Sequence, residues 1–227
     1  MTQQISGLSA DEADARSLRL TEIFFSLQGE TSYSGLPTVF VRLTGCPLRC
    51  VWCDTAYAFQ GGTRMTIAEI LEAVAKHPTR YVTVTGGEPL AQNDVHSLMR
   101  ALCDAGYTVS LETSGALDIG EVDPRVARIV DIKAPASGEA ERNRLTNLVH
   151  LTDRDELKFV LADRADFEWA RAFLAEHGPL PVREVLFSPV ADILPPSDLA
   201  AWILAAGLPV RMQLQLHKQI WGNAQGV

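Results

Sequence analysis

Three of the four cysteines lie in one short polar segment of the chain. Cys46, Cys50 and Cys53 have the spacing C-x3-C-x2-C, and Cys103 stands far from them. Three thiolates on one loop can bind one metal centre. Structural zinc usually takes four protein ligands, and the sequence has no second Cys/His pair at ligand spacing. An iron–sulfur cubane held by three cysteines leaves one iron open to a substrate or cofactor, and we expect such a cluster here.

Two different roles for these cysteines remain open. They could be core thiols that lie near one another by coincidence, or zinc ligands whose fourth partner is not evident from the sequence. A disulfide framework is not favoured, because it would need dispersed spacing and an oxidising compartment. Cys103 stands in a predicted helix beside Leu98 and Leu102, and we expect an inert core thiol there.

A glycine-rich motif, Gly86-Gly87-Glu88, follows the predicted strand at residues 81–85. Glycine pairs are common in turns, so this motif alone is not specific. Together with the preceding cysteine loop, however, it resembles the signature of the radical S-adenosylmethionine (SAM) superfamily. The resemblance implies a [4Fe–4S] cluster whose open iron binds SAM. The expected SAM-binding residues are Trp52, Cys53, Asp54, Gly87, Glu88, Glu112, Ser114, Asp131, Ile132, Lys133 and Ser188.

The remaining polar segments narrow the resemblance. Residues 25–31 read FSLQGET, residues 40–46 read FVRLTGC, and Cys53-Asp54-Thr55 closes the cysteine loop. Over almost the whole chain, from residue 19 to residue 225, the sequence closely resembles the 7-carboxy-7-deazaguanine synthase family. That resemblance implies a ring contraction in queuosine (7-deazapurine) biosynthesis, in which 6-carboxy-5,6,7,8-tetrahydropterin becomes 7-carboxy-7-deazaguanine with loss of ammonia. It also implies that SAM is regenerated.

The same resemblance implies a pterin-binding set and a magnesium ligand. The expected substrate-binding residues are Leu27, Gln28, Gly29, Arg42, Thr85 and His217, and the hydroxyl of Thr55 is expected to bind Mg²⁺. An arginine offers a planar pair of donors that suits a carboxylate, and Mg²⁺ prefers hard oxygen ligands. Ordinary structural roles remain open as well: a strand-edge arginine, a turn at Gln28, a turn hydroxyl at Thr55, a surface carboxylate at Glu112 and a solvated strand end at His217.

The elements that must position these residues alternate along the chain. Short apolar segments predict strands at residues 20–27, 38–43, 81–85, 107–111, 128–132, 156–161, 184–187 and 210–216. Helical spacing predicts helices at residues 66–77, 94–105, 164–176 and 198–206, the first with a capping box of Thr66 and Glu69. Polar motifs stand where strands end, which is where parallel α/β folds bind ligands. We expect an α/β fold of the radical SAM type, a partial (β/α) barrel of about six βα units.

Composition limits the remaining possibilities. The chain is 47% hydrophobic and 21% charged over 227 residues, which predicts a globular protein with a sizeable core. We expect a flexible leader at residues 1–18 and a single radical SAM domain at residues 19–227. A formal charge of −8 disfavours nucleic-acid and anionic-lipid partners. The sequence contains neither a long apolar run nor a signal peptide, and we expect a cytoplasmic protein.

Two other classes of function fit parts of the pattern. A radical activase, which takes hydrogen from a glycine of a partner protein, would share both motifs but would not need the Leu-Gln-Gly-Glu stretch or Arg42. A non-enzymatic module that holds zinc or a cluster would need the cysteines alone. For the synthase we expect a small-molecule pterin substrate, an external electron donor of the flavodoxin or ferredoxin type and, from the family, a homodimer.

Overall fold

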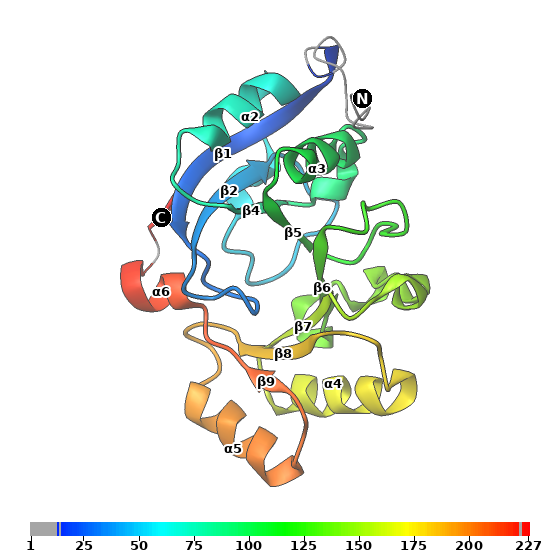
Figure 1. Cartoon of the computed structure of the whole chain (residues 1–227). Helices are drawn as coiled ribbons and strands as arrows, with labels where there is room; N and C mark the ends of the chain where they lie inside the picture. Colours follow the sequence, from blue (N-terminus) through cyan, green and yellow to red (C-terminus); the bar gives the residue numbers. More distant parts are fainter. Residues whose placement is uncertain (1–12, 14, 223) are drawn as a thin grey trace.

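The computed structural model describes residues 13, 15–222 and 224–227, which form a nine-stranded sheet (Figure 1). The strand order is β3-β1-β2-β4-β5-β6-β7-β8-β9. The bounds are Ser17–Leu27 (β1), Pro37–Leu43 (β2), Thr63–Thr66 (β3), Tyr81–Gly86 (β4), Thr108–Thr113 (β5), Ala127–Lys133 (β6), Glu156–Leu161 (β7), Glu184–Pro189 (β8) and Arg211–Met212 (β9). The ordered fold starts before the expected boundary at residue 19, because Leu18 of β1 is fully buried. Most of the expected leader, residues 1–12 and 14, lies outside the described residues.

Neighbouring strands are parallel along the part of the sheet that runs β2-β4-β5-β6-β7-β8-β9. Strand β1 is antiparallel to both β2 and β3. The short strand β3 was not predicted, since its TRMT sequence shows little apolar alternation. Because the carboxyl ends of the parallel strands point to the same edge, the polar motifs that follow them gather there.

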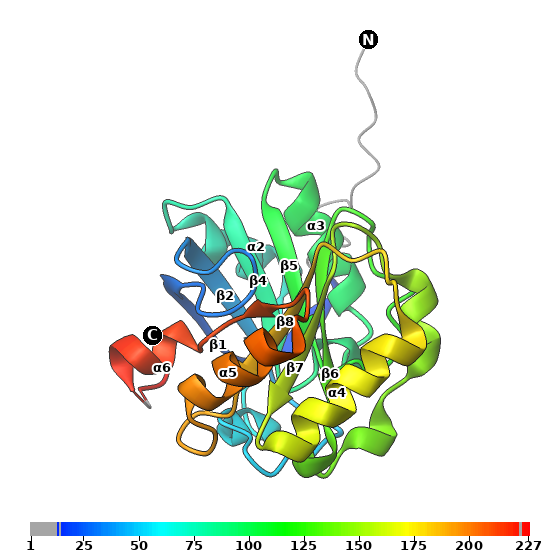
Figure 2. The same ribbon diagram turned by 90° about the horizontal axis from the view of Figure 1, so that it is seen from below.

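Five α-helices are described: Ile67–Ala75 (α2), Val95–Asp104 (α3), Arg164–His177 (α4), Pro196–Ala206 (α5) and Leu216–Trp221 (α6). The predicted capping box of Thr66 and Glu69 starts α2. Helices α2 to α5 lie along the outside of the curved sheet (Figures 1 and 2), which is the arrangement of a partial barrel. The connection from β6 to β7 carries three 3₁₀ turns, Pro135–Ser137, Ala140–Arg142 and Leu145–His150, instead of an α-helix.

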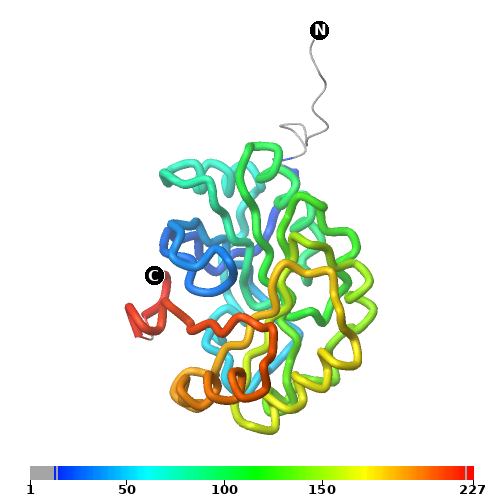
Figure 3. Tube along the Cα trace, turned by 60° about the horizontal axis from the view of Figure 1, so that its bottom comes forward, coloured from blue at the N-terminus to red at the C-terminus, as the bar shows by residue number. Residues whose placement is uncertain are grey.

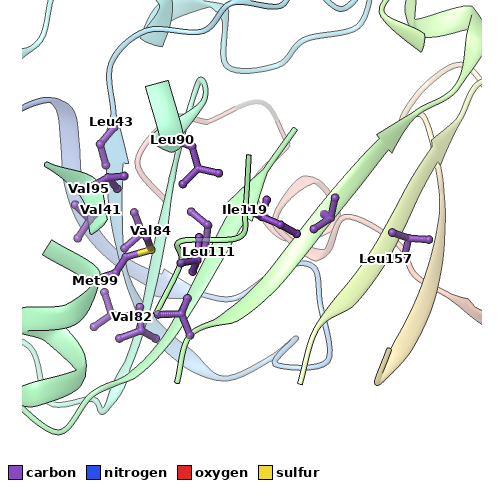
Figure 4. Packing of buried hydrophobic residues seen from close by; sticks show 14 of the residues in the cluster. Val41, Leu43, Val82, Val84, Leu90, Val95, Met99, Leu111, Ile119 and Leu157 are labelled. Carbon is purple, nitrogen blue, oxygen red and sulfur yellow. The ribbon is translucent and has the colours of Figure 1, made fainter. Parts of the chain in front are cut away.

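The hydrophobic core fills the space between the helices and the sheet. Figure 4 shows Val41 and Leu43 of β2, and Val82 and Val84 of β4, facing Met99 of α3. These side chains are fully buried, and removing one of comparable size from such a core typically costs about 2–5 kcal/mol. The core therefore fixes the strands whose ends carry the polar motifs.

The predicted strand at residues 210–216 was wrong in most of its length. Strand β9 covers only Arg211 and Met212, and Leu216 already begins α6. The segment leaves the sheet because it binds the loop after β1: the side chain of Gln213 exchanges hydrogen bonds of 2.6 and 2.7 Å with the backbone of Thr31. The C-terminal segment consequently lies beside the β1–β2 loop (Figure 3). No helix among the described residues is long and apolar enough to cross a membrane.

Candidate active site

The carboxyl ends of the strands surround a cavity of about 660 Å³. Its lining includes every predicted substrate-binding residue, the three clustered cysteines and Thr55. Eight of the predicted SAM-binding residues also line it: Trp52, Cys53, Asp54, Gly87, Glu112, Ser114, Asp131 and Lys133. The fold thus brings together, in one hollow, residues that are spread from the first strand to the C-terminal segment.

Backbone hydrogen bonds hold the cysteine loop in place at the cavity wall. Gly45 donates to the carbonyl of Ala58 at 2.8 Å and accepts from the amide of Glu88 at 2.8 Å, while Val51 donates to Ser137 at 3.1 Å. Gly45 has a φ of +102°, a conformation that favours glycine. These contacts fix the loop to the end of β4 and to the turn after β6.

The clustered cysteines are half-buried and belong to no disulfide. Burial raises the pKa of the Cys46 and Cys50 thiols, and the positive charge of Lys133 opposes that rise. Within the described part of the chain, no three His, Cys, Asp or Glu side chains converge to hold a single metal ion. A mononuclear zinc site needs such convergence, whereas the thiolates of a cubane bind separate irons. Three cysteines on one loop are compatible with a cubane cluster.

Gly87 lies where no side chain would fit. A Cβ atom on this residue would stand 2.3 Å from the carbonyl oxygen of Gly45 and 2.7 Å from the Cβ of Cys46. The glycine therefore allows the end of β4 to pack directly against the cysteine loop.

Three predicted SAM-binding residues do not line the cavity. The side chain of Ile132 packs in the hydrophobic core, and the fully buried Oγ of Ser188 has no hydrogen-bond partner among the described residues. The Glu88 carboxylate is also fully buried, and it accepts hydrogen bonds from the hydroxyls of Thr113 and Ser114 and from the amides of Leu90 and Ser114. Its side chain therefore organises the β4 and β5 ends from behind the cavity wall.

A half-buried carboxylate lines the cavity. Glu112 of β5 accepts a hydrogen bond from Thr85 at 2.9 Å and one from Gln28 at 3.2 Å. Gln28 also donates to Thr83 at 3.0 Å. Burial raises the pKa of Glu112, although the Thr85 hydrogen bond and the charge of Arg42 oppose this. Three predicted residues, Gln28, Thr85 and Glu112, thus form one network.

Charged pairs complete the wall. The Nζ of Lys133 lies 2.9 Å from the Asp131 carboxylate, and Asp131 Oδ1 is buried without a hydrogen-bond partner among the described residues. The hydroxyl of Thr55 donates to Asp54 at 2.8 Å, and Asp54 lies 3.4 Å from Lys218. Carboxylate and ammonium groups therefore both line the cavity that contains the cysteine loop.

Lys158 is a cavity residue that the sequence analysis missed. It lies on β7 in an ion pair with Glu30, which also accepts a hydrogen bond of 2.8 Å from Gln215. Burial lowers the pKa of Lys158 to about 8. The signal was visible in the sequence, because a lysine interrupts the otherwise apolar run LKFVL of a buried strand.

Comparisons with known proteins agree with this geometry. The profile of the Radical SAM superfamily matches residues 40–132. A 7-carboxy-7-deazaguanine synthase from Chlorobaculum tepidum is 49% identical, covering 92% of this chain and 97% of the relative. One from Koribacter versatilis is 47% identical, covering 90% and 97%. The crystal structure of QueE from Escherichia coli superposes with a TM-score of 0.75 at 23% identity over 90% of this chain and 97% of that one, a likeness of fold.

Proposed function

We propose roles for the residues of the cavity, and we start from the finding that the chain belongs to the 7-carboxy-7-deazaguanine synthase family of radical SAM enzymes. It catalyses the ring contraction of 6-carboxy-5,6,7,8-tetrahydropterin to 7-carboxy-7-deazaguanine with release of ammonia, a step of queuosine (7-deazapurine) biosynthesis. The observation that carries this function is the 49% identity along 92% of the chain. Neither the activase nor the non-enzymatic module gains support from these relatives.

An anaerobic assay tests this function. Enzyme reconstituted with iron and sulfide is mixed with SAM, a reductant and the carboxytetrahydropterin, and the product is identified by absorbance and mass. We expect 7-carboxy-7-deazaguanine from the native chain and from Cys103→Ala, and none from Cys50→Ala. SAM cleavage without a deazaguanine product would refute the assignment.

The residues present fit a cluster with SAM beside it. Cys46, Cys50 and Cys53 would hold the irons, and Gly87 lines the same cavity at the end of β4, where a cofactor would meet its backbone. Asp131 offers a buried carboxylate oxygen that no described residue uses, and a cofactor amino group would be a suitable donor to it. When bound, the cluster and SAM together supply the radical that removes a hydrogen atom from the substrate.

The protein's own residues would bind and orient the pterin. Arg42 lines the cavity and would meet the substrate carboxylate. The network of Gln28, Thr85 and Glu112 offers amide, hydroxyl and carboxyl groups to the polar edge of the ring. Because burial raises the pKa of Glu112, this carboxyl group holds a proton more readily than a solvated one. Lys158 of β7 and His217 of α6 line the same cavity.

Thr55 is the proposed magnesium ligand. Its hydroxyl lines the cavity next to the exposed Asp54 carboxylate, and both are hard oxygen donors of the kind that Mg²⁺ prefers. Two protein oxygens make a sparse site, so the ion would arrive with the substrate. We expect Thr55→Ala to raise the Mg²⁺ concentration that gives half-maximal activity, and Thr55→Ser to preserve it. Equal magnesium dependence in the two variants would contradict this role.

The remaining partners follow from the family premise. We propose a homodimer in the cytoplasm that receives electrons from a flavodoxin or a ferredoxin. Light scattering on the purified chain tests the dimer. Reduction of the reconstituted cluster by purified flavodoxin and by purified ferredoxin, followed by electron paramagnetic resonance, tests the donor.

A further inference from the structure

Arg42, the proposed partner of the substrate carboxylate, is held from one side by Glu22. The Nε of Arg42 donates to Oε1 of Glu22 at 2.7 Å, and their side chains are only 15% and 22% exposed. The two residues are direct partners in the antiparallel β1–β2 register, and the register shifts between Leu20 and Glu22. A bulge of this kind changes the direction of nearby side chains, and here the Glu22 carboxylate lies against the guanidinium of Arg42.

Aromatic groups fix this pair further. The hydroxyl of Tyr57 donates to the same Glu22 oxygen at 2.8 Å. The guanidinium carbon of Arg42 lies 5.5 Å from the centre of the Phe24 ring and 6.0 Å from that of Tyr57, distances at which cation–π attraction acts. The terminal Nη groups of Arg42 have no hydrogen-bond acceptor among the described residues, and the residue lines the cavity.

We propose that Glu22 is a positioning residue that makes the enzyme select carboxylated pterins. Glu22 accepts a hydrogen bond from Nε of Arg42, which leaves the two Nη groups of Arg42 as a pair of donors for a carboxylate in the cavity. The hydrogen bond from Tyr57 holds Glu22 in that orientation. An arginine held in advance loses less conformational entropy when it forms a bidentate pair. This inference rests on the proposed contact between Arg42 and the substrate carboxylate.

Two substitutions separate orientation from charge. Glu22→Gln keeps an oxygen that can accept from Nε but removes the negative charge, whereas Glu22→Ala removes both. If orientation is what matters, the glutamine variant keeps the selection and the alanine variant loses it. If Glu22 acted mainly through its charge, it would repel the incoming carboxylate, and both variants would bind the carboxylated ligand more tightly.

The test compares two ligands that differ only in the carboxylate, 6-carboxypterin and pterin. Dissociation constants are measured by anaerobic equilibrium dialysis on the reconstituted enzyme with SAM, and the fluorescence of the free pterin reports its concentration. We expect Glu22→Ala to reduce the preference for 6-carboxypterin about tenfold or more, the scale of one lost charge-assisted pair. In Glu22→Gln, the preference for 6-carboxypterin over pterin should stay within about threefold of the native preference. In Tyr57→Phe, this preference should lie between those of the Glu22→Ala and Glu22→Gln variants. The dissociation constant for pterin should not change.

The controls distinguish this inference from the proposal beneath it. Glu184→Ala removes another ion pair between neighbouring strands, to Arg211 at 2.8 Å and outside the cavity lining, and should leave both constants unchanged. If Arg42→Gln keeps the preference, the proposed substrate contact of Arg42 fails. If Arg42→Gln abolishes the preference but Glu22→Ala keeps it, or if Glu22→Ala weakens both ligands equally, the positioning role of Glu22 is overturned.

Discussion

Glu88 follows the end of β4 and does not line the cavity. Glu88 is fully buried, and its carboxylate accepts from the hydroxyl of Thr113 and from the amide and hydroxyl of Ser114. We expect Glu88→Ala to lower the free energy of unfolding by about 2–4 kcal/mol, because several buried donors lose their acceptor. Urea denaturation of the cluster-free chain measures this, with the exposed Glu121→Ala as a control that should stay within about 0.5 kcal/mol. Equal effects would contradict the role of Glu88.

Cys103 offers a prediction about pH. Its thiol packs against the core, and burial raises its pKa to about 11. A raised thiol pKa means that the thiolate is scarce below that value, so alkylation by iodoacetamide should stay slow at pH 8 to 9 and accelerate toward pH 11. Mass spectrometry of Cys103 peptides measures the rate at each pH, and the unfolded chain in urea serves as the reactive reference. A folded-state rate that already levels off near pH 9 would contradict the shift.

The sequence predicted which residues face the cavity better than it predicted their partners. The cysteines, Arg42 and Thr85 stand in motifs next to strand ends, and strand geometry brings such ends together. The contact of Glu22 with Arg42 depends on a bulge in β1, and the contact of Lys158 with Glu30 joins β7 to a loop far along the chain. Neither pairing leaves a periodic signal, because the first depends on the register between β1 and β2 and the second on a contact between a strand and a distant loop.

At the scale of elements, the cysteine loop packs closely against the end of β4. A Cβ on Gly87 would clash with the backbone of Gly45 and with Cys46. We expect Gly87→Ala to displace the loop and to reduce the iron retained per chain after reconstitution by at least about half, since a shift of about 1 Å misplaces a ligand. Gly207→Ala is the control: its φ of +59° makes alanine strained, yet nothing lies near its Cβ. Full iron content in Gly87→Ala would show that the loop adapts.

The junction between β6 and β7 depends on a buried ion pair. Asp155 accepts hydrogen bonds from the backbone amide of Arg128 at 2.8 Å and from its Nε at 3.0 Å. The side chain of Asp155 is 0% exposed and that of Arg128 is 8% exposed. We expect Asp155→Ala to cost about 3–5 kcal/mol of unfolding free energy, because it leaves the arginine buried and unpaired. Circular dichroism in urea measures this. The exposed pair of Asp118 and Arg144 is the matched control, and Asp118→Ala should leave the urea midpoint close to that of the native chain, because solvent screens an exposed ion pair.

The boundaries of the elements were predictable where the pattern was local. The capping box at Thr66 and the apolar spacing after it placed the start of α2 correctly, and the strand at residues 156–161 matched β7. The segment at residues 210–216 alternates in an apolar pattern that favours a strand. It leaves the sheet after Met212 because Gln213 binds the backbone of Thr31, a tertiary contact that overrides the local preference.

For the whole molecule, the cavity is closed by chain segments that are distant in sequence. The lining runs from Phe24 of β1 to Val227, and residues 224–227 contribute to it after α6. The amide of Leu216 donates to the carbonyl of Gly29 at 3.0 Å, which anchors this segment to the loop that carries Gln28. The partial barrel therefore leaves an open side that the C-terminal segment covers (Figures 1 and 3).

Removing residues 224–227 tests whether this cover belongs to the active site or only to the fold. The sheet, from β3 to β9, and the cysteine loop stay intact in such a variant, so the midpoint of thermal unfolding and the iron content should remain within error of the native chain. The cavity, by contrast, loses part of its wall and admits water, so we expect KM for the carboxytetrahydropterin to rise at least about tenfold and kcat to fall. Steady-state kinetics under anaerobic conditions measure both constants. A truncated chain with native KM would mean that the segment lies over the cavity without contributing to binding, and a large loss of thermal stability would mean that its role is to hold the barrel together.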